Sequence, residues 1–317
     1  WVEAAPDAPD AKRRALARID ALAKPSAILV STTKFLDLES LAAVTSRPGD
    51  LVGLHFASPI EQLKLLECAR TPLTLPDALA TVMKLGRALG KVTVAVRGHV
   101  AHRLRAPYLR EALFLLEEGA LPQEVDLTLT EFGFRTGPFA ALDLLGYEEI
   151  LEERRVRFAQ LTAREQACTL LEELTRLGRT GRASGLGFYR YEGGRAAPDP
   201  SIVPLLERHS KARATARRAI APEEIRERCV FSVINEAARI LAEGVAARPL
   251  EIDLIGVHGF SFPTYRGGPL FFADQLGLDQ VIQRMQRLRE QLGEEYWTPA
   301  PLIERLRAGG QGFYVGS

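Results

Sequence analysis

The sequence predicts an α/β sheet domain over residues 1–97, followed by two helical domains. Three observations lead to this fold class. The chain has 317 residues, 46% of them hydrophobic, which is enough for a sizeable core divided among two or three domains. Short apolar strand patterns alternate with helix patterns as far as Val96, whereas the remaining residues show helix patterns with few β-branched runs long enough for strands.

The elements of the first part follow from local patterns. "WVEAA" resembles the end of a strand, and residues 9–23 place Leu16, Ile19 and Leu22 at helical spacing between charges. "SAILVSTT", residues 26–33, is a short buried strand that ends in hydroxyl residues, which completes a strand-helix-strand unit. The elements expected next are a helix at 37–45, strands at 51–56 and around 63–69, a helix at 76–89 and a strand at 91–96.

The helical part contains an internal repeat. Residues 108–146 and 232–277 share, in the same order, Glu-Ala, an apolar helix face, Glu-Gly, an aspartate-containing helix, Gly-Phe, Gly-Pro and Leu-Gly. "GLGFYRY" at 185–191 corresponds in the same way to "GQGFYVG" at 310–316. The sequence therefore predicts domains at 98–195 and 196–317, with the break near 192–201.

Charge and cysteine content exclude several classes of protein. Forty-one basic and 40 acidic residues leave a net charge of +1, so no overall field attracts nucleic acid or an anionic membrane. Three widely spaced cysteines indicate neither a disulfide framework nor a zinc site, and they favour a reducing, cytoplasmic compartment. No apolar run reaches the roughly 18 residues of a membrane helix. We expect a soluble protein without membrane insertion.

Five segments in order resemble one family. "SAILVSTT", "LVGLHFASPIEQLKLLECAR", "ALGKVTVAVRGHVAHR", "FGFRTGPFAALDLLG" and "GLGFYRY" are similar to segments of the 3-hydroxyacyl-CoA dehydrogenases. The doubled helical unit resembles the dehydrogenase part of the multifunctional fatty-acid oxidation enzyme. This resemblance implies a Rossmann-type parallel sheet domain that binds NAD, followed by two related helical domains that close over the acyl-CoA substrate. It also implies oxidation of 3-hydroxyacyl-CoA to 3-oxoacyl-CoA, by a homodimer or within a larger fatty-acid oxidation complex.

Against that family, the sequence starts inside the Rossmann-type domain. The first βαβ unit, with its Gly-x-Gly-x-x-Gly turn, is missing, and "GLGFYR" lacks the third glycine and follows a helix. That turn normally holds the pyrophosphate of the dinucleotide. Either the chain is a piece of a longer protein, or it is a relative that has discarded the cofactor.

His55 and Glu67 are the candidate catalytic pair. Oxidation of a hydroxyl group needs a base for its proton, and the pKa of histidine near 6.5 suits that role at neutral pH. A hairpin-like return after the strand at 51–56 would bring Glu67 to the far ring nitrogen of His55. The alternative is a core histidine beside an unrelated glutamate. The resemblance implies that His55 is the general base and that Glu67 orients it.

Other positions around the expected reaction centre depart from the family pattern. Lys34 replaces a serine, Ser58 replaces an asparagine, and His102 replaces the asparagine that touches the reacting oxygen. Two accounts compete: Lys34 and His102 have taken over those roles, or selection for dehydrogenation has relaxed and the chain is an acyl-CoA-binding or assembly module. The resemblance places four further residues at the cofactor, Glu3, Lys12, Ser31 and Thr33, and four at the substrate, Ser58, Lys64, Gly137 and Pro138.

We predict no metal site from the sequence. His99 and His102 have the spacing of two zinc ligands on a helix, but no third ligand is obvious nearby. His209, within the basic run "RHSKARATARR", is expected to be structural or exposed to solvent. That run itself is either a solvated helix face or linker, or a contact for a phosphorylated ligand.

Overall fold

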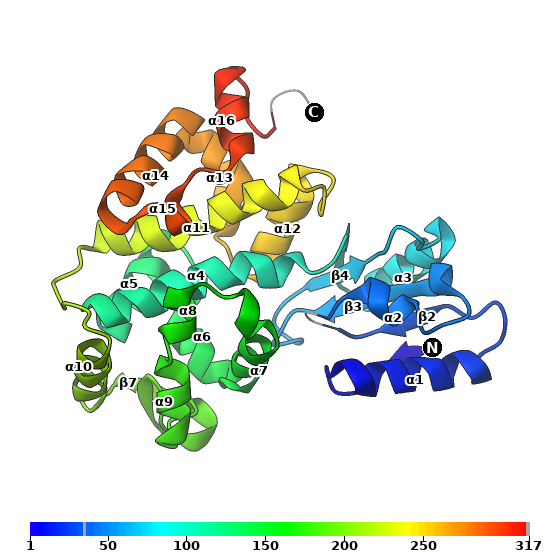
Figure 1. Ribbon diagram of the computed structural model, residues 1–317, viewed down its shortest axis with the longest axis horizontal. Helices are drawn as coiled ribbons and strands as arrows, with labels where there is room; N and C mark the ends of the chain where they lie inside the picture. The colour runs from blue at the N-terminus through cyan, green and yellow to red at the C-terminus, as the bar shows by residue number, and fades with distance from the viewer. Residues whose placement is uncertain (34–35, 315–317) are drawn as a thin grey trace. The chain divides into compact units, whose positions relative to one another are not determined.

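The computed structural model describes residues 1–33 and 36–314 (Figure 1). The chain forms two compact units, Trp1–Arg105 with Ile234–Ser317, and Ala106–Val233. The boundaries of these units fall within two long helices, α4 (Val100–Glu118) and α11 (Pro222–Ala242). The predicted domain boundaries at 97/98 and 195/196 stay a prediction.

A five-stranded sheet organises the first unit. Its strands lie in the order β1 (Val2–Glu3), β2 (Leu29–Ser31), β3 (Leu51–Phe56), β4 (Leu65–Ala69) and β5 (Val92–Val96). All neighbouring pairs are parallel except β3 and β4, which are antiparallel. The predicted parallel sheet is confirmed with this one exception. Its physical reason is that the connection 57–64 is shorter than the dozen or so residues that a parallel crossover needs.

Helices cover both faces of this sheet because side chains alternate along the strands. Leu29 and Leu51 pack with helices α1 (Pro9–Leu22) and α2 (Leu38–Ala42). The neighbouring residues Val30 and Val52 pack instead with α3 (Pro76–Ala88). The predicted strands and helices of residues 1–97 are all present, with ends that differ by a few residues.

The rest of the first unit is helical. Helix α12 (Pro249–Gly259) contacts β4 and β5, and Gly259 allows a close approach, since a Cβ atom there would lie 2.3 Å from Leu65 Cδ2. The segments that follow are η4 (Thr264–Arg266), α13 (Pro269–Leu276), α14 (Leu278–Leu292), α15 (Glu294–Trp297) and α16 (Pro301–Ala308).

The second unit is mainly helical. It contains α5 (Pro122–Phe132), α6 (Pro138–Leu145), α7 (Glu148–Arg157), α8 (Ala163–Ala167), α9 (Leu170–Arg176) and α10 (Ile202–Ala212). The predicted break near 192–201 coincides with an antiparallel hairpin of β6 (Tyr189–Glu192) and β7 (Arg195–Pro198). Gly193 and Gly194 both have positive φ angles, 57° and 79°, as a tight two-residue hairpin turn requires.

The internal repeat is visible in the hydrogen bonds that the Asp126 carboxylate accepts in the second unit. Its carboxylate accepts hydrogen bonds from the backbone N–H groups of Phe139 and Ala140, each at 2.9 Å, at the start of α6. The hydroxyl of Tyr189 donates to the same carboxylate at 2.8 Å. Gly137 is required beside it, because a Cβ atom there would lie 2.3 Å from Asp126 Cγ.

Asp253 makes the same arrangement in the first unit. It accepts from the N–H groups of Leu270 at 2.8 Å and Phe271 at 2.9 Å at the start of α13, and from the hydroxyl of Tyr314 at 2.6 Å. A Cβ atom on Gly268 would lie 2.4 Å from Asp253 Cβ. The two stretches that the sequence aligns therefore use one and the same capping arrangement, which confirms that the helical parts are related.

A second aspartate is repeated as well. Asp143 accepts from the N–H groups of Phe188 and Tyr189, and Asp274 accepts from those of Phe313 and Tyr314, all at 2.9 Å. These contacts give Asp143 a structural role. These bonds attach each "GFY" segment to its own helix.

Candidate active site

His55 and Glu67 face each other across the antiparallel pair β3 and β4. They are register partners, and His55 Nδ1 lies 2.6 Å from Glu67 Oε2. His55 is 8% exposed and Glu67 is fully buried. The predicted hairpin return therefore does bring the two side chains together, and a charge-assisted hydrogen bond of this length is strong in a buried setting.

Helix α4 holds the other oxygen of the glutamate. The backbone N–H groups of Val100 and Ala101 donate to Glu67 Oε1 at 2.8 and 3.0 Å, where the helix begins. Burial works against the charge of Glu67. The hydrogen bond and charge of His55, together with the N–H of Ala101, outweigh burial and hold the pKa of Glu67 below its usual value. An ionised carboxylate that only accepts fixes the proton of a neutral His55 on Nδ1.

This tautomer leaves Nε2 of His55 as the basic nitrogen. The one side-chain hydrogen bond found for His55 among the described residues is this contact with Glu67, which uses Nδ1 and not Nε2. His55 comes near the end of β3, which is parallel to β1 and β2, so it lies at the edge where these strands end. Ligands of open α/β sheets bind at that edge.

The charge of Glu67 predicts a pH dependence of stability. Because its folded pKa lies below the usual 4.5, the carboxylate contributes its full stability above that pH and loses it as the pH falls through the lower folded value. We expect the free energy of unfolding to fall more steeply with acid in the wild type than in Glu67→Gln. Urea unfolding at a series of pH values from about 7 to 3 measures this. Parallel curves for the two proteins would contradict the prediction.

Two further histidines border the pair. The ring centroids of His55 and His102 are 5.2 Å apart, and those of His55 and His99 are 6.3 Å apart. Burial lowers the pKa of His99 to about 4, reinforced by the charges of His55 and His102 and opposed by Glu67, so His99 is neutral near pH 7. Arg105 Nη2 lies 3.1 Å from His102 Nδ1 and can only donate. The proton of a neutral His102 ring is therefore on Nε2.

Of the remaining residues that the sequence predicts at the reaction centre or the substrate, those that the structure describes have no contact with His55 or Glu67 among the hydrogen bonds described above. Lys34 lies outside the described residues. Ser58 is half-buried just after β3, and Lys64 is exposed just before β4. Gly137 and Pro138 belong to the second unit, at the start of α6, where Gly137 packs against Asp126. Substrate contacts at Ser58, Lys64, Gly137 and Pro138 stay a prediction.

The four predicted cofactor residues have partners within the protein. Lys12 is fully buried and its Nζ lies 3.1 Å from Glu3 Oε2. Ser31 Oγ donates to the same carboxylate at 2.6 Å, and Thr33 Oγ1 donates to Asp7 at 2.9 Å. This network joins β1, α1 and β2. A direct contact of Lys12 with a cofactor would need the network to open, so the cofactor role of these residues stays a prediction.

Residues 1–48 contain no glycine. The turn between β1 and α1 is Ala-Ala-Pro-Asp-Ala, and Asp7 and Asp10 place negative charge near the start of the helix. A pyrophosphate needs backbone N–H groups and positive potential at such a helix start. The turn between β1 and α1 therefore does not itself offer such an anion site.

Two family profiles cover almost the whole chain. Residues 1–99 match "3-hydroxyacyl-CoA dehydrogenase, NAD binding domain", and residues 98–191 and 225–314 match "3-hydroxyacyl-CoA dehydrogenase, C-terminal domain". The sheet domain with its buried histidine and glutamate is thus a dinucleotide-binding domain of the dehydrogenase class. The chain belongs to the 3-hydroxyacyl-CoA dehydrogenase family.

Relatives come from animals and bacteria. The peroxisomal bifunctional enzyme of Homo sapiens is 38% identical over 317 aligned residues, which cover 94% of this chain and 44% of that protein. The fatty acid oxidation complex subunit alpha of Vibrio vulnificus is 32% identical, covering 95% of this chain and 42% of that protein. The crystal structure of the dehydrogenase part of multifunctional enzyme 1 from C. elegans matches with a TM-score of 0.68 at 26% identity. The match covers 96% of this chain and 70% of that chain. The chain spans less than half the length of these two curated relatives.

Sequence reasoning identified the pair but missed its support. The backbone donors of Val100 and Ala101 were not predicted, although the start of a helix after the strand at 91–96 was a usable signal. Arg105 was also missed, because its contact with His102 depends on one turn of α4.

Among the described residues, no helix is both long and apolar enough to cross a membrane.

Proposed function

We propose that this chain oxidises 3-hydroxyacyl-CoA to 3-oxoacyl-CoA with NAD, with His55 as the general base and Glu67 as the residue that orients it. The observation that carries the proposal is the buried contact of 2.6 Å between His55 Nδ1 and Glu67 Oε2, with Nε2 left as the basic nitrogen. Membership of the 3-hydroxyacyl-CoA dehydrogenase family supports the substrate class and the cofactor.

The chemistry follows from the protonation state of the pair. His55 Nε2 takes the proton of the 3-hydroxyl group while the C3–H bond breaks, and the ring becomes an imidazolium. NAD, when bound, accepts the hydride from C3. Glu67 stabilises the imidazolium through Nδ1–H, and its own charge is held by the N–H groups of Val100 and Ala101. Neutral His99 adds no positive charge that would oppose this step.

His102 is proposed as a donor to the reacting oxygen. Its Nε2–H is in the same histidine cluster as His55, at the position where the family has an asparagine. We expect His102→Ala to lower kcat/KM by about 10- to 100-fold, somewhat below the loss of one oxyanion donor in other enzymes. Steady-state assays with a 3-hydroxyacyl-CoA measure this. His102→Asn should keep more activity than His102→Ala, because its amide also donates, and equal losses in the two variants would contradict the role.

A second function competes with this one. The changes at positions 34, 58 and 102 are also what a catalytically impaired acyl-CoA-binding or assembly module would show. The test is NADH formation by the folded protein at saturating NAD, with acyl-CoA binding measured by calorimetry in parallel. NADH formation supports the enzyme. Binding of acyl-CoA without NADH formation supports the module and sinks the proposal.

Wider assignments rest on the same resemblance. We place the reaction in fatty-acid β-oxidation because a relative is named as a subunit of a fatty acid oxidation complex. A homodimer or a larger complex of that kind is the proposed assembly. A reducing, cytoplasmic compartment is supported by three buried cysteines without disulfides, Cys68, Cys168 and Cys229. Gel filtration coupled to light scattering tests the assembly.

A further inference from the structure

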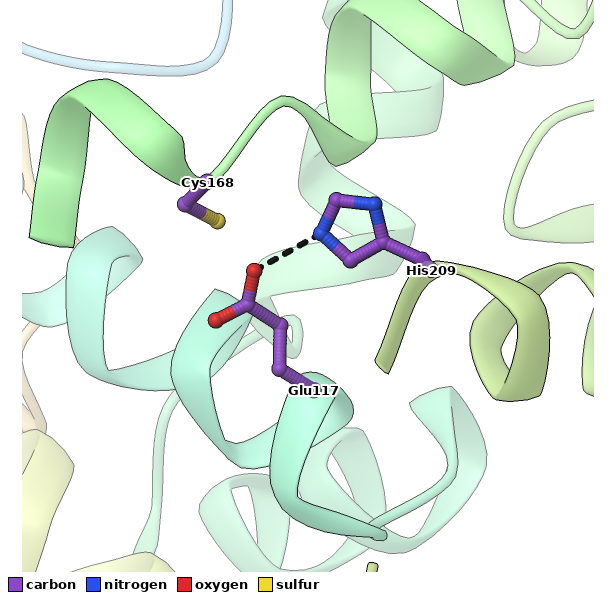
Figure 2. Close-up of side chains that lie close together, drawn as sticks. All are labelled: Glu117, Cys168 and His209. Atoms are coloured by element: carbon purple, nitrogen blue, oxygen red, sulfur yellow. Dashed lines mark hydrogen bonds and ion pairs between the residues drawn. The ribbon is translucent and has the colours of Figure 1, made fainter. Parts of the chain in front are cut away.

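A second cluster of reactive side chains lies in the second unit, where Glu117, Cys168 and His209 meet (Figure 2). Glu117 is near the end of α4, Cys168 directly follows α8, and His209 is on α10. One ligand atom from each residue lies within 4.8 Å of the other two, and Glu117 Oε1 is 2.7 Å from His209 Nε2. All three side chains are buried. Three separate segments thus direct an oxygen, a sulfur and a nitrogen at one point.

A fourth residue orients the imidazole. Glu173, on α9, lies 2.8 Å from His209 Nδ1 through its Oε1 atom. A carboxylate on the far nitrogen fixes the ring so that Nε2 points at Glu117 and Cys168. The same relay of carboxylate and histidine is usual behind zinc-bound histidines, where it sets the tautomer and makes the ligand more basic.

We propose that Glu117, Cys168 and His209 form a zinc-binding site, with Glu173 as the positioning residue behind His209. Thiolate, imidazole nitrogen and carboxylate oxygen are the ligands that Zn²⁺ prefers. Zinc ligand atoms stand about 3–4 Å apart around the ion, given bond lengths of about 2.0–2.3 Å, so only small side-chain shifts are needed. The second oxygen of Glu117 or a water molecule completes the four-coordinate shell.

Zinc binding is compatible with burial because it conserves the charge of the cluster. Without metal, a histidine between two carboxylates holds a proton on each ring nitrogen, and the thiol holds its own proton. Zn²⁺ displaces the Nε2 proton and the thiol proton, both of which leave to solvent. Two positive charges replace two protons, so the net charge of the buried groups does not change.

The sequence could not predict this site. Its three residues are separated by dozens of positions, and none belongs to a CxxC or HxxH pair. The sequence instead predicts no metal, and it treats His209 as structural or exposed. Only the fold brings Cys168 and His209 to Glu117.

The test is zinc retention by the full chain. The protein is unfolded in denaturant with a thiol reductant, refolded with equimolar Zn²⁺, passed through a weak chelator and analysed for metal by mass spectrometry. We expect one zinc per chain in the wild type and in Cys229→Ser, a matched control at a second buried cysteine. Cys168→Ser and His209→Gln are expected to retain none. Glu173→Gln should weaken zinc binding by about 10- to 100-fold, as the loss of other residues behind metal ligands does.

Cobalt gives a second, spectroscopic readout, which in the wild type does not depend on whether a variant folds. Refolding with Co²⁺ should produce the near-ultraviolet charge-transfer band of a thiolate-bound ion, and this band should be present in Cys229→Ser and absent from Cys168→Ser. Failure of the wild type to retain zinc, or a wild-type cobalt complex without the thiolate band, would overturn the proposal even if a variant failed to fold. Equal zinc retention by Cys168→Ser would overturn it too.

Discussion

Replacing His55 with glutamine is expected to lower kcat for 3-hydroxyacyl-CoA oxidation by about 10²–10⁴-fold, the usual contribution of a general base. The glutamine amide can still donate to Glu67, so the buried carboxylate keeps a partner and the fold is preserved. What is lost is the basic nitrogen at the position of Nε2. Initial rates of NADH formation at saturating substrate, with circular dichroism to check folding, measure the effect.

The matched control is His258→Gln, which changes another histidine of the first unit on α12 and should keep the wild-type rate. Glu67→Gln tests the positioning role, because an amide no longer stabilises the imidazolium. We expect it to lower kcat while leaving KM nearly unchanged. A His55→Gln variant that turns over within a factor of about two of the wild type would remove His55 from the mechanism.

Replacing Asp126 with alanine is expected to destabilise the protein by at least about 3 kcal/mol, because three buried donors lose their acceptor at a cost of about 1–3 kcal/mol each. These donors are the N–H groups of Phe139 and Ala140 and the hydroxyl of Tyr189. The loss also uncaps the start of α6. Urea unfolding followed by circular dichroism measures the change.

Asp253→Ala in the other copy of the repeat should cost a similar amount, since its three donors are equivalent. Asp279→Ala provides the control, because the Asp279 side chain is 81% exposed and should change stability little. If one variant lost much of its free energy of unfolding and the other lost none, the equivalent hydrogen bonds of Asp126 and Asp253 would not have the same structural role.

Local patterns were sufficient to predict the sheet domain. Short continuous apolar runs predict β2 to β5, and apolar residues at helical spacing predict the helices between them. The pairing of His55 with Glu67 was predicted from the family resemblance together with the short return between the two strands, whereas the residues alone left a core histidine as the alternative. The repeated aspartates were visible as a sequence repeat, although their hydrogen bonds were not.

What the sequence did not predict depends on contacts between side chains of different structural elements. Glu67 is held by the first residues of α4, more than 30 positions away. Lys12 is neutralised by Glu3 from a neighbouring strand, so a lysine suited to a cofactor lies buried in a protein network. Glu117, Cys168 and His209 come together only when α4, α8 and α10 pack, and no spacing rule covers such a set.

We propose that the histidine-glutamate pair still serves hydride transfer despite the changes around it. The most direct test compares NADH formation from a 3-hydroxyacyl-CoA by the wild type and by Lys34→Ser with His102→Asn, which restores the family residues. We expect the wild type to turn over and the double variant to be no more than a few-fold faster. A silent wild type beside an active double variant would contradict it and show that the site has been switched off.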